Sequence, residues 1–150
     1  MPCGDITDHL KIQFDSDSRI LRYKLRKKSC GGTVGSRAMI GRWIKLRTAE
    51  QVLSTTPREI MRLHPQTSDM QEYLVLKHFL AVQAALRMML GIEPGRASDY
   101  CTIDSIEYGP EGTLLQAEID VNGMTEEIKA CNVAIRPVHS DSAHMDIRKP

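Results

Sequence analysis

The chain has 150 residues, enough for one domain with a real core and too few for two domains of ordinary size. Its composition, 41% hydrophobic and 26% charged, is close to that of an average soluble globular chain and far from that of a disordered or membrane protein. The 20 basic and 19 acidic side chains leave a net charge of +1, so the overall charge favours neither nucleic acid nor an acidic surface as a partner.

The sequence also bears on location. Residues 1–5 contain no basic segment followed by an apolar run, and nowhere do about 18 uncharged apolar residues follow one another. We therefore expect a cytoplasmic protein without a membrane contact. In a reducing compartment cysteines need not form disulfides, so thiol chemistry, metal binding and plain burial all remain open for Cys3, Cys30, Cys101 and Cys131.

The first third of the chain predicts a β-hairpin followed by a helix. Apolar and polar residues alternate over residues 10–14 and again over 21–25, which indicates two strands with one buried face. From Thr33 onward a helical stripe fits better, through Val34, Met39, Ile40, Trp43, Ile44 and Leu46. The Cys30-Gly31-Gly32 turn is therefore expected to join a strand to a helix.

Three further helices are predicted from their starting residues. Thr48 with Gln51 has the spacing of a capping box, and Thr56-Pro57 with Glu59 adds a proline at the first helical position to a second one. Ser68 opens a third helix, whose apolar residues recur at helical spacing until Gly91. This helix, about residues 69–90, is expected to be the main helical support of the core.

The last third predicts a β-meander. Residues 102–108, 113–121 and 124–135 have the pattern of strands, and Asn122-Gly123 is typical of a type I′ hairpin turn between the last two. A three-stranded meander is marginally stable alone, so we expect residues 94–137 to pack on the first part of the chain. Residues 138–150 are polar and aperiodic, which predicts a flexible tail.

Two cysteine motifs could carry chemistry. Cys3-Gly4-Asp5 places a soft thiolate and a hard carboxylate two residues apart. Cys30 would stand at a helix N-terminus, which lowers the pKa of a thiol and favours the thiolate that binds metal. Each pattern is weak alone, because cysteine is often just a small buried residue.

Taken together, these motifs are more specific. A Cys-Gly-Asp segment, a hairpin, Cys-Gly-Gly, the segment 48–53 and the segment 85–90 together resemble the NifU/IscU-type iron-sulfur cluster assembly scaffolds, over roughly residues 2–91. The resemblance implies an α+β fold with a small antiparallel sheet, backed by helices of which the last is longest. The expected organisation is a scaffold domain at 1–93, the β-meander extension at 94–137 and the tail at 138–150.

The resemblance implies that the third cysteine of that family is replaced in this chain. The family has a His-Cys pair near the start of its last helix, and a register anchored on Leu86-Arg87 places Lys77-His78 there. A shift by one residue would put Lys77 at the cysteine position and leave no ligand. We favour His78, because imidazole binds zinc and can replace cysteine on iron-sulfur iron. The alternative is a structural histidine at the edge of the core, bonded to backbone.

The resemblance implies a carrier and not an enzyme. Iron or a transient cluster, such as [2Fe-2S], would bind at one exposed site and be passed to apo-protein acceptors; the predicted ligands are Cys3, Asp5, Cys30 and His78. Cysteine desulfurase is an implied partner, and a homodimer is possible. Imidazole cannot carry a persulfide, so de novo assembly is in doubt. The alternative is a degenerate, zinc-binding homologue that uses the same residues for structure or regulation.

Other readings are weaker. A thiol enzyme using Cys30 would need a partner base or a Cys-x-x-Cys motif, and neither is present. The basic run of residues 22–28 could bind nucleic acid, but it lacks interleaved aromatic residues, so a solvated strand face is favoured. We expect Cys101 and Cys131 to be core residues of strands. The other histidines have no fitting spacing partners and are expected at the surface: His9, His64, His139 and His144.

Overall fold

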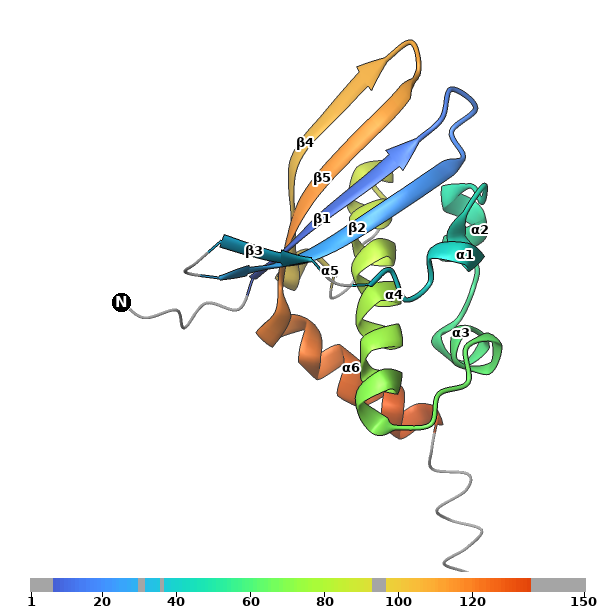
Figure 1. Ribbon diagram of the computed structural model, residues 1–150, viewed down its shortest axis with the longest axis vertical. Coiled ribbons are helices and arrows are strands. Elements are labelled where there is room, and N and C mark those ends of the chain that lie inside the picture. Colours follow the sequence, from blue (N-terminus) through green and yellow to red (C-terminus); the bar gives the residue numbers. More distant parts are fainter. Residues whose placement is uncertain (1–6, 30–31, 36, 93–96, 136–150) are drawn as a thin grey trace, which may run out of the picture.

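The computed structural model describes residues 7–29, 32–35, 37–92 and 97–135. It confirms the α+β class: helices pack on one face of a five-stranded antiparallel sheet with the strand order β3-β2-β1-β5-β4 (Figure 1). In chain order the elements are β1 (Thr7–Phe14), β2 (Ile20–Ser29), β3 (Gly32–Gly35), α1 (Gly41–Ile44), α2 (Ala49–Leu53), α3 (Pro57–Leu63), α4 (Asp69–Leu90), α5 (Ala97–Tyr100), β4 (Cys101–Gly109), β5 (Gly112–Asp120) and α6 (Val121–Ile135).

The predicted first hairpin is confirmed. β1 pairs antiparallel with β2, and Leu10 lies opposite Leu25 while Ile12 lies opposite Tyr23. All four of these side chains are buried on the helix-covered face. The alternation in sequence therefore follows the two faces of the sheet, one packed on helices and one open to water.

The predicted helix starts are confirmed as well. The side chains of Thr48 and Thr56 each close a capping box, and Ser68 accepts a hydrogen bond from the Gln71 N–H at the start of α4. α4 ends at Gly91, which has a φ of 68°, a left-handed conformation that glycine adopts without a steric cost. By length and composition α4 could cross a membrane, but 61% of its most apolar window is buried inside the protein. It is the central helix of the core.

The predicted helix from Thr33 is wrong. Gly32–Gly35 form β3, which pairs with the end of β2, and α1 begins only at Gly41. Leu46, expected on the buried stripe, is 51% exposed. The free edge of β2 offers backbone partners to a short β-branched segment, and this pairing outweighs the helical spacing. Because Ser29 pairs with Gly32, residue 30 does not precede a helix, and the helix-based argument for a lowered thiol pKa at Cys30 fails.

The predicted third strand of the meander is also wrong. Residues 121–135 form α6, and Val121, Met124 and Ile128 are buried at helical spacing. The Asp120 side chain accepts a hydrogen bond from the Asn122 N–H at 3.1 Å, as an N-cap residue does. A Cβ on Gly123 would lie 3.0 Å from the Tyr100 Cβ, so this glycine allows close packing of α6 and makes no hairpin turn.

The β4–β5 hairpin joins the first hairpin in one sheet. β5 pairs along the whole of β1, with Leu10 opposite Ala117 and Ile12 opposite Leu115. Leu115, Ala117 and Ile119 are fully buried, and α6 crosses below the sheet against α4 (Figure 1). The three strands before residue 94 and the two strands after it therefore belong to one sheet. Residues 138–150, predicted to be a tail, lie outside the described residues.

Candidate functional site

The predicted ligands fall mostly outside the described part of the chain. Cys3, Asp5 and Cys30 are not among the described residues, whereas His78 lies on α4. The strand pairing nevertheless positions the segments next to them. Thr7, two positions after Asp5, pairs with Lys28, two positions before Cys30. The start of β1 and the end of β2 are therefore neighbours at one end of the sheet.

A buried ion pair joins this end of the sheet to α4. The Lys77 Nζ lies 2.8 Å from Oδ2 of Asp8, whose side chain is only 2% exposed. Asp8 Oδ1 is buried and has no hydrogen-bond partner among the described residues. Burying a carboxylate oxygen without a hydrogen-bond partner costs free energy of folding. Packing alone therefore does not explain why an aspartate stands at position 8.

His78 is bonded within the core. Its Nδ1 lies 2.7 Å from the Tyr23 hydroxyl, which also accepts a hydrogen bond from the Ile40 N–H at 3.1 Å. The two rings meet edge to face, with centroids 5.7 Å apart. His78 is buried, so the expectation of an exposed site does not hold for this residue. The structural alternative predicted a hydrogen bond from His78 to backbone, whereas its partner in the structure is the Tyr23 side chain.

Burial determines the protonation of this pair. Burial, with a smaller contribution from the Lys77 charge, lowers the pKa of His78 to about 4, so the imidazole is neutral at pH 7. Burial also raises the pKa of Tyr23 well above its usual range, so the hydroxyl keeps its proton. A neutral imidazole is the form that binds a metal ion.

The hydrogen bond between Tyr23 and His78 has two possible directions. The hydroxyl has one hydrogen and two lone pairs, of which one lone pair accepts the Ile40 N–H. The hydroxyl can donate to Nδ1, or Nδ1–H can donate to its second lone pair. In the second case the lone pair of Nε2 is available to a metal ion. Tyr23 would then hold the orientation of the ring, as the hydrogen-bond partners of metal-binding histidines do.

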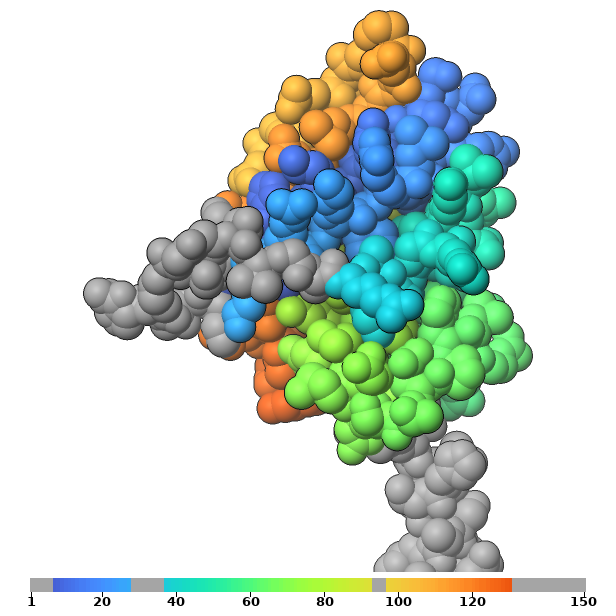
Figure 2. Space-filling view, in the orientation of Figure 1, coloured from blue at the N-terminus to red at the C-terminus, as the bar shows by residue number. Residues whose placement is uncertain are grey.

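The open face of the sheet carries a second polar group of residues. Figure 2 shows strands β1, β2, β4 and β5 at the surface, with no helix over them. On this face His9, Asp104 and Glu118 present ligand atoms that all lie within 4.8 Å of one another. The His9 Nδ1 is 3.8 Å from Asp104 Oδ2, and His9 Nε2 is 3.2 Å from Gln116 Oε1. The set combines one nitrogen and two carboxylates, all suitable metal ligands.

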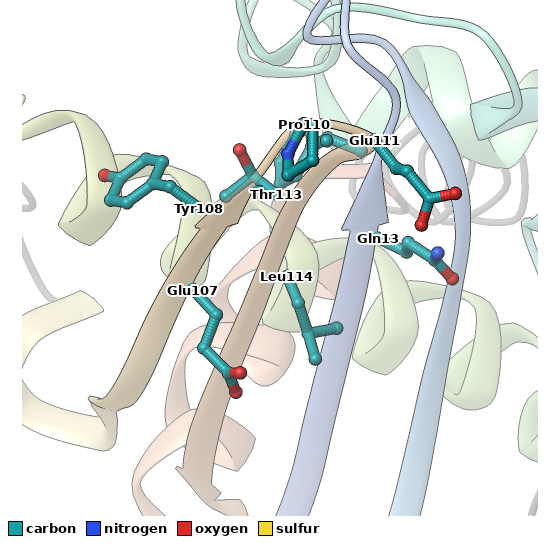
Figure 3. A pocket seen from close by; sticks show the side chains of 10 residues that line it. Gln13, Glu107, Tyr108, Pro110, Glu111, Thr113 and Leu114 are labelled. Atoms are coloured by element: carbon teal, nitrogen blue, oxygen red, sulfur yellow. The ribbon is translucent and has the colours of Figure 1, made fainter.

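A hollow of about 250 Å³ lies where the β4–β5 turn meets the end of β1 (Figure 3). In Figure 3 Tyr108 points away from Gln13 and Glu111, so its hydroxyl does not join these polar groups. The hollow follows from the close approach of the turn to β1. A Cβ on Gly112 would lie 1.9 Å from the Phe14 carbonyl oxygen, so only glycine fits there.

Some of the predictions for the other cysteines and histidines are confirmed, and others are wrong. Cys101 is buried in β4 as expected, and burial raises the pKa of its thiol to about 11, which makes it unreactive. Cys131 belongs to a helix and not to the predicted strand. His64 is partly buried and bonded to the Ile60 carbonyl. His9 is partly buried within the His9, Asp104 and Glu118 group.

Sequence reasoning missed several polar residues at these two places. Asp8 precedes Leu10, Ile12 and Phe14 on the buried face of β1, so the strand alternation alone marks it as a buried carboxylate. Tyr23 could be recognised in the same way as a hydroxyl on a buried face. His9, Asp104 and Glu118 lie far apart in the chain, and no local spacing signals that they meet.

Comparison with protein-family models, with curated proteins and with solved structures finds no match. The case for a function therefore depends on the residues and their arrangement.

Proposed function

We propose that the protein is a cytoplasmic carrier that binds iron or a [2Fe-2S] cluster as cargo and delivers it to apo-proteins. The proposed ligands are Cys3, Asp5, Cys30 and His78. The observation that supports this most is the pairing of Thr7 with Lys28, at one end of the sheet, because Thr7 follows Asp5 by two positions and Lys28 precedes Cys30 by two positions. The Lys77–Asp8 ion pair brings α4, one residue before His78, to the same end.

The order of the elements supports a scaffold of the NifU/IscU type. Three strands, β1 to β3, form a meander on one side of the sheet, and α1 to α4 follow, with α4 the longest. For residues 1–93 the resemblance implies a small antiparallel sheet backed by helices of which the last is longest, and β3 stands where a helix was expected to begin. The β4–β5 hairpin and α6 would then be an addition to that fold, in which β5 uses the second edge of β1.

The state of His78 also supports a ligand role. The imidazole is neutral because its pKa is lowered to about 4, so binding a metal requires no loss of a proton to solvent. With Nδ1–H donating to the Tyr23 hydroxyl, Nε2 would be the ligand atom. Second partners of this kind fix the tautomer and the orientation of metal-bound histidines.

The proposed ligand set favours transfer of a cluster over its construction. Imidazole cannot form a persulfide, so His78 cannot take the sulfur-accepting role of the cysteine that it replaces. The Asp5 carboxylate is a hard ligand beside soft thiolates, and its weak hold on iron would ease release of the cargo. A cysteine desulfurase would be a partner only by delivering sulfur to Cys3 or Cys30, whereas apo-protein acceptors are required in either case.

Anaerobic reconstitution of the full chain with ferrous iron and sulfide tests the proposal. We expect visible absorption and bound iron in the wild type, loss of both in Cys30→Ser, and retention of iron reduced about ten-fold in His78→Ala. Cys101→Ala and His64→Ala are matched controls, because Cys101 is an unreactive core thiol and His64 bonds to a backbone carbonyl. Circular dichroism checks folding. A wild type that stays colourless and free of iron would refute the carrier function.

A zinc-binding protein that uses the same residues is the second candidate function, and the types of ligand suit zinc. Two thiolates, one imidazole and one carboxylate match the donors of closed tetrahedral zinc sites, whose role is structural or regulatory. Purified protein that holds one zinc ion, resists exchange with iron and loses zinc in Cys30→Ser would support this function. His78→Cys separates the two cases, since restoring a third thiolate should change the absorption of a reconstituted cluster but leave a zinc protein colourless.

A further inference from the structure

The group on the open face of the sheet, His9 with Asp104 and Glu118, is separate from His78, the one proposed cluster ligand among the described residues. His9, Lys11 and Gln13 alternate with the buried residues of β1 and therefore lie on the face away from the helices. Glu118 is the cross-strand partner of His9 on β5. His78 and Tyr23 lie on the covered face. The sheet therefore lies between this group and the His78–Tyr23 pair.

A hydrogen-bond chain fixes the orientation of His9. The Gln116 amide nitrogen lies 3.4 Å from Glu107 Oε2 and 3.3 Å from Ser105 Oγ. Glu107 is a carboxylate and can only accept, so the amide nitrogen belongs on that side and the carbonyl oxygen faces His9. That oxygen can also only accept, so His9 Nε2 must carry the hydrogen of the neutral ring. The lone pair is therefore on Nδ1.

Nδ1 then faces the two carboxylates. It lies 3.8 Å from Asp104 Oδ2, and ligand atoms of Asp104, Glu118 and His9 all lie within 4.8 Å of one another. A cation placed among these three groups would have one nitrogen and two carboxylate oxygens as ligands. Ligands bound to one ion at about 2.1 Å stand roughly 3 to 4 Å apart; the 3.8 Å between His9 and Asp104 falls in this range, and the other separations do not exceed 4.8 Å.

A β-bulge in β4 places Asp104 in this group. The register of β4 against β5 shifts between Ile103 and Ser105, so Asp104 has no direct cross-strand partner. Because of the bulge, the consecutive residues Asp104 and Ser105 both contact residues on the open face. Asp104 lies beside His9, and Ser105 is bonded to Gln116. Bulges often redirect a side chain at functional sites.

From this arrangement we propose that His9, Asp104 and Glu118 bind a divalent transition-metal ion, with Gln116 orienting the imidazole. Two carboxylates balance the charge of the ion, and one imidazole with two oxygens suits manganese, iron(II) or zinc. Three protein ligands leave further coordination positions for water. Lys11, Lys24 and Arg26 line a hollow of about 140 Å³ together with His9, and their positive charge weakens the binding of a cation. We therefore expect a dissociation constant in the micromolar range.

Manganese(II) is the best probe, because it prefers carboxylate and imidazole and binds thiolates poorly. Its binding to the full-length protein is followed by the loss of the electron paramagnetic resonance signal of the free ion. Asp104→Asn keeps the shape of the side chain and should weaken binding at least ten-fold, as should His9→Gln. Glu111→Gln removes a carboxylate from the same hairpin but outside the group, and should change the affinity less than two-fold.

The outcomes separate this site from the proposed cluster site. Cys3→Ser, Cys30→Ser and His78→Ala should leave manganese binding unchanged, so failure of the carrier function would not affect the result. Urea unfolding of each variant checks that the sheet is intact. A wild type that binds no manganese at millimolar concentration, or an Asp104→Asn variant that folds and binds as the wild type does, would show that the group is only a His9–Asp104 ion pair.

Discussion

His78 is a titratable side chain held where its charged form is disfavoured. Its pKa is lowered from 6.5 to about 4 in the folded protein, whereas in the unfolded chain it titrates near 6.5. Above pH 6.5 both states are neutral and the full stability is present. As the pH falls toward 4 only the unfolded state takes up the proton, so the folded state loses stability.

We therefore predict that about 2 kcal/mol of the free energy of unfolding is lost between pH 7 and pH 5 because of His78. Urea unfolding at several pH values measures it. His78→Gln should remove this part of the pH dependence, while His64→Gln should retain it. The same pH dependence in His78→Gln and in the wild type would contradict the assignment.

The Asp8–Lys77 ion pair should stabilise the packing of α4 on β1. Lys77→Met leaves the Asp8 carboxylate buried without a partner, and we expect a loss of about 3 kcal/mol in the free energy of unfolding. The double variant Asp8→Leu with Lys77→Met should regain most of it, because no uncompensated charge remains. Chemical denaturation measures all three proteins.

The matched control is an exposed pair. The Lys129 Nζ lies 3.5 Å from Glu126 Oε2, and both side chains are more than half exposed, so Lys129→Met should cost less than about 0.5 kcal/mol. Equal losses in Lys77→Met and Lys129→Met would show that burial of the Asp8 pair has no energetic consequence.

At the scale of the elements, local signals predicted those parts of the fold that local forces determine. The alternation in β1 and β2, the two capping boxes and the Ser68 and Gly91 ends of α4 all depend on residues within a few positions of one another. β3 and α6 depend on distant partners. β3 forms because β2 has a free edge, and α6 forms because Val121, Met124 and Ile128 find a core to pack on. The Asn122-Gly123 signal was outweighed by that packing.

The β4–β5 turn depends on one glycine. Gly112 has a φ of 141°, and an added Cβ would meet the Phe14 carbonyl oxygen at 1.9 Å. We predict that Gly112→Ala costs at least about 2 kcal/mol, because the turn must move away from β1. Gly109→Ala, whose Cβ would meet its first neighbour at 3.8 Å, should cost less than about 1 kcal/mol. Thermal unfolding of the pair measures the difference, and equal melting temperatures would contradict it.

For the whole molecule, one sheet and one core join both halves of the chain. Residues 1–93 alone would lack β5, which pairs along all of β1, and would expose the underside of α4 that α6 covers. We predict that this fragment has no cooperative unfolding transition by circular dichroism, whereas residues 1–135 unfold as the full chain does. A fragment 1–93 with an unchanged unfolding midpoint would show that the N-terminal part folds alone.

The candidate sites show the same difference: residues joined by local contacts can be predicted from the sequence, and residues joined by distant contacts cannot. His78 was predicted as a ligand from the family resemblance, in a register anchored on Leu86-Arg87 of the same helix, but its bond to Tyr23 crosses from α4 to β2. The His9, Asp104 and Glu118 group joins three strands and depends on a shift of register in β4. Only the folded sheet brings those residues together, so no spacing in the sequence could reveal them.

The bulge in β4 has a further consequence for how molecules of this protein meet one another. β4 is at the end of the strand order, so one row of its backbone groups has no partner strand among the described residues. A flat edge of this kind can add a strand from a second molecule and begin aggregation. The irregular register at Asp104 and the exposed charges of Asp104 and Glu107 oppose that addition. The residue that completes the proposed metal site thus also helps to keep the chains apart at high concentration.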